Sequence, residues 1–212
     1  MSKKIKSINL VLPIIIVVII IAIIIAVNSS SSNKGLLKKL SDNLKEKNIY
    51  QFSMEKDFQN KTIIVKNGED TAIDTYNNGE HKTTMVKDGI TKHVLHDREE
   101  YYIYNNSSIA ENILIEWIND VLEKECTETG KEKIRGKTYY YEEYSGSSMF
   151  VEENQPSIQD ENVKTRFYFD KNNNLVYVKT IYENTSEEVL KIEIKEQIDN
   201  EVFTIPENYA EN

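Results

Sequence analysis

Hydrophobic residues are distributed in two different ways along this chain. Residues 10–27 (LVLPIIIVVIIIAIIIAV) are continuously apolar and carry no charged side chain. From residue 34 onward the apolar residues recur instead at the spacings of amphipathic helices and strands. The pattern therefore predicts an apolar N-terminal segment, a polar linker at residues 28–33, and one folded domain over residues 34–212, which is long enough to enclose its own hydrophobic core.

The apolar segment has the length of a membrane-spanning helix. At about 1.5 Å per residue it would extend about 27 Å, close to the thickness of the hydrocarbon core of a bilayer. Signal peptidase needs a small residue two positions before the last residue that it removes. Ala26 would be that last residue, but Ile24, two positions before it, is large. We therefore expect a retained signal anchor, and cleavage stays open as the alternative. Lys3, Lys4 and Lys6 precede the segment, and flanking lysines favour the cytoplasmic side.

This interpretation gives the chain four parts and a location. Residues 1–9 are expected to be a short cytoplasmic tail, residues 10–27 a transmembrane signal anchor, residues 28–33 a linker, and residues 34–212 an extracytoplasmic domain. The expected location is the cell membrane, as a single-pass protein whose N-terminus is cytoplasmic and whose C-terminal domain is extracellular.

Residues 34–47 are predicted to form a first helix, because leucines recur there at helical spacing and Asn33 is a suitable N-terminal cap. After this helix the pattern changes to the alternation that is typical of strands. Asn-Gly or Asp-Gly pairs at 67–68, 78–79 and 88–89 separate successive runs, and such pairs are the strongest short hairpin signal. The predicted strands of this meander cover residues 51–58, 61–66, 71–76, 82–87 and 91–104.

A second helix is predicted to interrupt the strands. Ser108 and Glu111 have the spacing of a capping box, and the apolar residues around and after them fall into two adjacent i, i+4 rows, which need a large apolar partner such as a sheet. The rows are Ile109, Ile113, Trp117 and Val121, and Ala110, Leu114, Ile118 and Leu122. Further strands are predicted at residues 127–134, 137–144, 164–170, 175–184 and 187–198, and a long acidic loop at 145–162.

The order helix, strands, helix, strands predicts the fold class. We expect an α+β, mostly β domain, in which the helices lie on the concave side of a strongly curved antiparallel sheet.

Charge and cysteine content exclude some classes of function. The net charge is -9, and without the three lysines near the N-terminus the rest of the chain carries 23 basic and 35 acidic residues, a balance of -12. Nucleic acid is therefore not an expected partner, because phosphate contacts need clustered lysine and arginine. Cys126 is the only cysteine, so no disulfide can form within the chain, although a bond between two chains stays open.

The sequence contains no motif for a nucleophilic serine, a phosphate-binding loop or a dinucleotide. His93 and His96 are three residues apart in a predicted strand, which places them on opposite faces, and His81 is expected to be solvated beside a turn. We therefore expect no metal site, no cofactor and no enzymatic activity.

Several local phrases recur in an order that resembles a known group of proteins. They are residues 86–89 (VKDG) leading to 101–104 (YYIY), 134–139 (IRGKTY), 167–170 (FYFD) with 175–177 (LVY), and 202–209 (VFTIPENY). With the order of the elements, they resemble the bacterial lipoprotein-carrier superfamily, the LolA/LolB-like and LppX-like proteins, over residues 34–209. The resemblance implies an incomplete barrel whose apolar interior holds acyl chains. A chain anchored through residues 10–27 differs from a diffusing carrier, so a tethered acceptor, scaffold or sensor is expected.

Three functions follow as hypotheses. The first is an extracytoplasmic binding protein with an apolar groove for lipid or lipoprotein acyl chains, whose candidate lining residues are Ile113, Trp117, Phe167, Phe169 and Ile192. The second is an envelope sensor or scaffold of the same fold that binds a protein partner and no ligand. The third is an enzyme, which needs a pair of carboxylates, or a histidine and a carboxylate, in a cleft. The expected partners are thus the membrane through residues 10–27, a lipid or lipoprotein, or an envelope protein.

Overall fold

The computed structural model describes residues 35–57, 59–104, 113–145, 163–182 and 187–212, and residues Leu36–Asn212 form one compact unit. No helix within these described ranges combines the length and the apolar character needed to cross a bilayer. This finding contradicts the expected transmembrane, single-pass topology and the expected cell-membrane location. Residues 1–9, 10–27 and 28–33, on which that expectation rested, lie outside the described residues.

The described residues form a mostly β structure with two α-helices and one open sheet of 12 strands that does not close into a barrel. The strand order is β12-β6-β5-β4-β3-β2-β1-β11-β10-β9-β8-β7. Neighbouring strands are antiparallel apart from the short parallel pair β12 and β6. The bounds are α2 Leu36–Lys47, β1 Ile49–Glu55, β2 Asn60–Asn67, β3 Asp70–Asn77, β4 Glu80–Lys87, β5 Ile90–Leu95, η1 His96–Arg98, β6 Glu100–Tyr104, α3 Ile113–Leu122, β7 Cys126–Ile134, β8 Lys137–Ser145, β9 Lys164–Phe169, β10 Leu175–Ile181, β11 Glu187–Lys195, η2 Asn200–Phe203 and β12 Ala210–Glu211.

Two of the predicted tight turns connect β3 with β4 and β4 with β5. At Asn78-Gly79 and Asp88-Gly89 both turn residues have positive φ, with values of 49° and 94°, and 52° and 74°. This is the mirror-image turn whose twist matches that of a hairpin, and asparagine, aspartate and glycine tolerate it best. The expected mostly β class and the predicted antiparallel hairpins at these two turns are therefore confirmed.

The expected single strand over residues 91–104 is wrong, because the chain reverses inside it. β5 ends at Leu95, the three residues of η1 follow, and β6 pairs back antiparallel against β5. Glu99 completes this turn with a positive φ of 54°, a conformation that a residue other than glycine adopts at some energetic cost.

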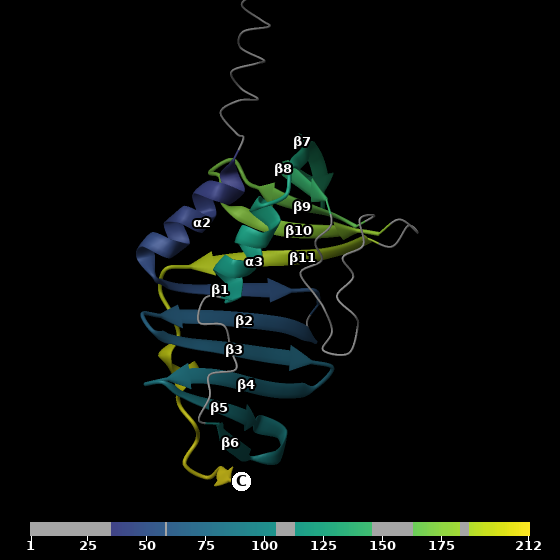
Figure 1. Ribbon diagram of the computed structural model, residues 1–212. Helices are drawn as coiled ribbons and strands as arrows, with labels where there is room; N and C mark the ends of the chain where they lie inside the picture. The colour runs from purple at the N-terminus through teal and green to yellow at the C-terminus, as the bar shows by residue number, and fades with distance from the viewer. Residues whose placement is uncertain (1–34, 58, 105–112, 146–162, 183–186) are drawn as a thin grey trace, which may run out of the picture. The chain divides into compact units, whose positions relative to one another are not determined.

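The two helices lie on one face of the sheet, over the half that contains β1 and β8–β11 (Figure 1). The N-terminus of α2 is held by a distant carboxylate: the backbone N–H groups of Leu36 and Leu37 donate to the buried side chain of Glu142 on β8, at 2.8 and 3.2 Å. A carboxylate at this end satisfies free N–H groups and complements the helix dipole. The predicted capping box at Ser108 and Glu111 lies outside the described residues.

A second apolar cluster lies on the opposite face of the other half of the sheet. Alternation along β2 shows this directly, because Ile64 belongs to the cluster under the helices and its neighbour Val65 to the second cluster. The C-terminal segment that follows β11 contributes Phe203, with Ile205 and Tyr209 packed against the cluster. In Figure 1 this yellow segment runs past the ends of β2–β5 to the far edge of the sheet.

Candidate functional sites

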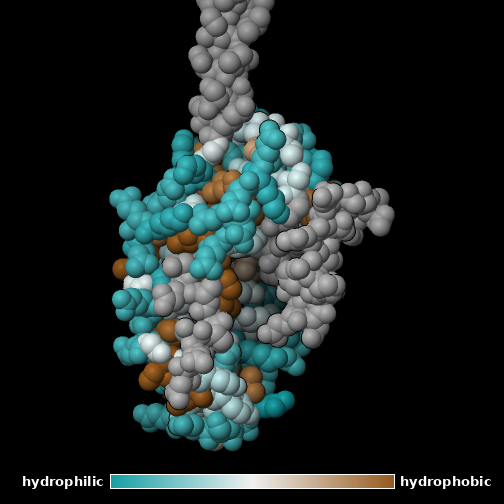
Figure 2. Space-filling view, in the orientation of Figure 1, coloured by the Kyte–Doolittle hydropathy of each residue, from teal (hydrophilic) through white to brown (hydrophobic). Residues whose placement is uncertain are grey.

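The structure brings four of the five predicted groove residues into one apolar layer (Figure 2 shows the surface on this side of the molecule). Phe167, Phe169 and Ile192 are fully buried between the sheet and the helices, and Trp117 of α3 packs against them with its ring centroid 5.5 Å from that of Phe167. Ile113, at the start of α3, is exposed and is not part of this layer. At these residues the layer is packed side chain against side chain, so a preformed groove does not run through them.

An opening lies at the edge of the same layer. A pocket of about 460 Å³ is lined by Met54 and Leu190, both members of the buried cluster, and by polar side chains around them. Met54 pairs across the strands with Ile192, so the pocket floor is in register with the predicted groove. The other lining residues are Lys56, Asn60, Lys61, Thr62, Thr75, Tyr76, Asn77, Asn78, Tyr182 and Glu188.

Two polar groups of this layer are buried without a hydrogen-bond partner among the described residues: the Tyr140 hydroxyl and the indole N–H of Trp117, which can only donate. A buried donor without an acceptor costs about 1–3 kcal/mol, and buried polar groups are nearly always paired, so each exception calls for an explanation. A bound group with a carbonyl or ester oxygen would supply the missing acceptor.

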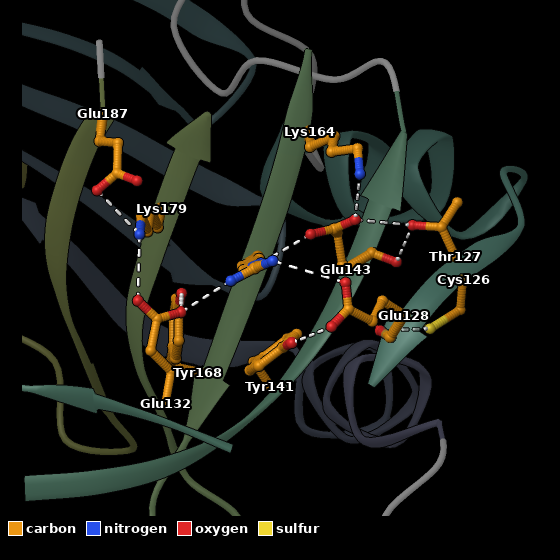
Figure 3. A network of polar contacts seen from close by, with 11 residues as sticks. Cys126, Thr127, Glu128, Glu132, Tyr141, Glu143, Lys164, Tyr168, Lys179 and Glu187 are labelled. Carbon is orange, nitrogen blue, oxygen red and sulfur yellow. Dashed lines mark hydrogen bonds and ion pairs between the residues drawn. The ribbon is translucent and has the colours of Figure 1, made fainter. Parts of the chain in front are cut away.

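On the side of the sheet facing away from the helices, β7–β10 carry a network of ion pairs (Figure 3). Arg166 donates from Nε to Glu143 at 2.7 Å and from a terminal nitrogen to Glu132 at 2.8 Å, and its guanidinium lies 4.4 Å from the ring centroid of Tyr141. Glu132 also accepts from Lys179 at 3.2 Å. Figure 3 shows Glu143 and Glu128 at one end of the network and Glu132 with Lys179 at the other.

The network favours the charged form of two of its carboxylates, Glu143 and Glu132. Burial alone would raise the pKa of Glu143, but hydrogen bonds from Arg166 and Lys164 outweigh burial and hold that pKa below its usual value. The pKa of Glu132 is likewise lowered, since bonds from Tyr168, Lys179 and Arg166 outweigh its burial. Both carboxylates face basic side chains directly, so the network is typical of structural cross-linking between strands rather than of a reactive site.

A third group of side chains lies under the C-terminal segment and combines two histidines with a carboxylate. His81 on β4 contacts Asp74 on β3, with 2.7 Å between Nε2 and Oδ1. Thr83 donates to the same Asp74 oxygen at 2.6 Å and lies 2.8 Å from Nε2 of His96 in η1. The imidazole rings of His81 and His96 stack with centroids 3.8 Å apart, and Tyr209 contacts Nδ1 of His96 at 3.1 Å.

This cluster borders a pocket of about 260 Å³. Burial and the neighbouring His81 lower the pKa of His96, which keeps that imidazole neutral near pH 7. The expectation of a solvated His81 is wrong, since its side chain is only 27% exposed and binds Asp74. His93 lies apart from the other two histidines and contacts Thr84 on the neighbouring strand.

Comparisons with known proteins do not assign the chain to a family. No family model matches it and no curated protein matches it. One similar solved structure is an uncharacterized conserved protein from Thermus thermophilus, at 10% sequence identity and a TM-score of 0.48, covering 85% of this chain and 98% of that one. At this identity and TM-score the similarity supports no statement about function.

Proposed function

We propose that the domain is a binding protein rather than an enzyme, and that it takes an amphiphile, a lipid or the acyl chain of a lipoprotein, at the layer between helices and sheet. The buried, unpaired N–H of Trp117 carries this proposal, because among the described residues it is a donor without an acceptor inside an apolar layer. An acyl ester has an apolar chain, which suits the apolar layer, and a carbonyl oxygen, which would accept the hydrogen bond of the Trp117 N–H.

The extent of the apolar layer supports a sheet that curves around the helices. A single cluster joins α2 and α3 to side chains of β1, β2 and β8–β11, with Ile73 of β3 packed against it. Seven flat strands would extend about 29 Å at about 4.8 Å per step, whereas two helices side by side cover about 20 Å. A sheet that bends toward the helices lets them reach all seven strands, which is the arrangement that the lipoprotein-carrier resemblance implies.

The pocket at Met54 and Leu190 is the entry we propose. Its volume of about 460 Å³ lies within the range of small-molecule sites, and its apolar floor continues into the layer that contains Ile192 and Trp117. Its rim is polar and includes Lys56 and other hydrogen-bonding side chains, which suits the head group of an amphiphile. The chain would extend from this rim along the sheet toward Trp117, displacing side chains of the packed layer.

Native mass spectrometry of residues 34–212 with an added C16 lysolipid tests the proposal. We expect one lipid adduct in the parent protein and a strongly reduced adduct in Thr62→Phe, which fills the pocket from a strand position opposite Met54. Lys133→Phe, on the exposed face of the β7–β8 hairpin, is the matched control and should bind as the parent does. A clean apo mass in the parent, or equal uptake by Thr62→Phe, would contradict the proposal and favour a closed core that serves a protein partner.

A further inference from the structure

Three side chains of metal-ligating types converge under the C-terminal segment. Asp74, His81 and His96 each offer one ligand atom, and these atoms all lie within 4.8 Å of one another. They come from β3, β4 and η1, so the sheet register and the turn after β5 bring them together. We propose that Asp74, His81 and His96 form a binding site for a divalent transition-metal ion of the zinc type. This site lies on the opposite face of the sheet from the proposed amphiphile site and does not depend on it.

The ligand set suits such an ion. Imidazole nitrogen and carboxylate oxygen bind Zn²⁺ at about 2.0–2.2 Å, and three protein ligands leave a fourth position open for water or a ligand. Soft ligands are not part of the cluster, because the only cysteine, Cys126, is on β7. Two histidines with one carboxylate and no thiolate favour a borderline ion such as Zn²⁺ or Co²⁺ over Mg²⁺ or Ca²⁺.

The surroundings of the cluster orient its ligands. Tyr209 contacts Nδ1 of His96 at 3.1 Å, which leaves Nε2 facing Thr83 and Asp74. In metal sites the second ring nitrogen of a ligating histidine is typically held by such a partner.

The adjoining pocket gives a cation access and an attractive field. Besides Asp74 it is lined by Asp199 and Glu201, and no lysine or arginine is among the described residues around it. Neither carboxylate belongs to the group of ligand atoms within 4.8 Å of one another, so the fourth coordination position is left to water or a bound ligand. The negative charges of these carboxylates also raise the local concentration of cations at the pocket.

Binding requires a local rearrangement. The two imidazole rings lie within 9° of parallel, so their in-plane lone pairs do not yet meet at one point. The hydroxyl of Thr83 now joins Asp74 to His96 with bonds of 2.6 and 2.8 Å. A metal ion would replace these hydrogen bonds and turn the rings toward a common centre, and the partial exposure of His81 leaves room for that movement.

Titration of the full-length chain with Zn²⁺ by calorimetry, and with Co²⁺ by visible absorption, tests the site. We expect one bound ion per chain and a visible absorption spectrum typical of Co²⁺ with few ligands. We also expect the affinity for the metal to fall at least tenfold in His81→Gln and in His96→Gln. His93→Gln is the matched control, since it removes the third histidine, which contacts Thr84 away from the cluster. Circular dichroism of each variant separates loss of the site from loss of folding.

The outcomes divide clearly. Retained binding in both His81→Gln and His96→Gln, an equal loss in His93→Gln, or no binding at about 100 µM metal overturns the proposal. If His96→Gln does not fold, Asp74→Asn and the shift of the His81 and His96 ring ¹⁵N signals on adding Zn²⁺ to the parent protein give the same decision. Shifts confined to these two rings support the site, and shifts of the His93 ring alone refute it.

Discussion

Replacing Arg166 by methionine removes the centre of the ion-pair network while keeping a side chain of similar length. Arg166 bridges Glu143, whose side chain is 1% exposed, and Glu132, which is 30% exposed. Without it, Glu143 keeps Lys164 at 3.0 Å, a partner whose own side chain is 51% exposed. Removing one member of a buried ion pair costs about 3–5 kcal/mol; because Lys164 remains, we expect about 3 kcal/mol of lost unfolding free energy at pH 7.

The loss of stability in Arg166→Met should depend on pH. The pKa values of Glu143 and Glu132 are lower in the folded chain than the usual 4.5, because bonds from Arg166 and Lys164 hold down the first and bonds from Tyr168, Lys179 and Arg166 the second. Their contribution is therefore fully present above about pH 4.5 and is lost as the pH falls through the lowered pKa values. In Arg166→Met, Glu143 keeps only Lys164 of its two basic partners and loses less stabilisation on protonation, so the difference in unfolding free energy from the parent narrows on acidification.

Urea denaturation of the two proteins at pH 7 and at about pH 3.5 measures both effects. Lys38→Met is the control, because it breaks an exposed pair with Asp42 at 3.2 Å and should cost less than about 0.5 kcal/mol. A loss below about 1 kcal/mol for Arg166→Met at pH 7, or an equal loss at both pH values, would refute the reasoning.

Two further substitutions test the roles of individual residues. Glu142→Ala removes the acceptor for the N–H groups of Leu36 and Leu37. We expect the free energy of unfolding to fall by about 1–2 kcal/mol and amide hydrogen exchange to become faster in the first turn of α2. Unchanged exchange there would contradict the capping role. Gly130→Ala places a Cβ 2.8 Å from the hydroxyl oxygen of Tyr141, whose ring is held by the Arg166 guanidinium. We expect thermal unfolding to show a destabilisation of about 1–3 kcal/mol. An unchanged stability would show that the ring moves freely.

Short sequence patterns predicted the strands and several of the turns between them. The features that these patterns did not predict include pairings between residues far apart in the chain. The Asn78-Gly79 and Asp88-Gly89 hairpins were predictable because the turn residues themselves carry the required backbone conformation. The reversal inside residues 91–104 was not, since Glu99 adopts its positive φ without glycine to mark it. The pairing of β1 with β11 joins residues far apart in the chain, and no local pattern encodes it.

The same error concealed the histidine cluster. With residues 91–104 taken as one strand, His96 could not approach His81, and the turn at η1 is what brings them into contact. Part of the cluster was nevertheless accessible from the sequence: the Asn78-Gly79 hairpin register places Asp74 opposite Thr83, two residues from His81 on the same face. For the apolar layer, the sequence placed Phe167 and Ile192 among the residues expected to line a groove, but it could not show that they pack into a closed layer or where that layer opens.

Fluorescence of Trp117, the only tryptophan in the chain, tests the proposed amphiphile site most directly. A lysolipid with a brominated acyl chain quenches an indole only on close approach, so the emission reports contact at the layer between α3 and the sheet. We expect saturable quenching in the parent protein, in Lys133→Phe and not in Thr62→Phe, with an unbrominated lysolipid causing no quenching. Emission that stays unchanged in the parent at saturating brominated lipid would contradict the account.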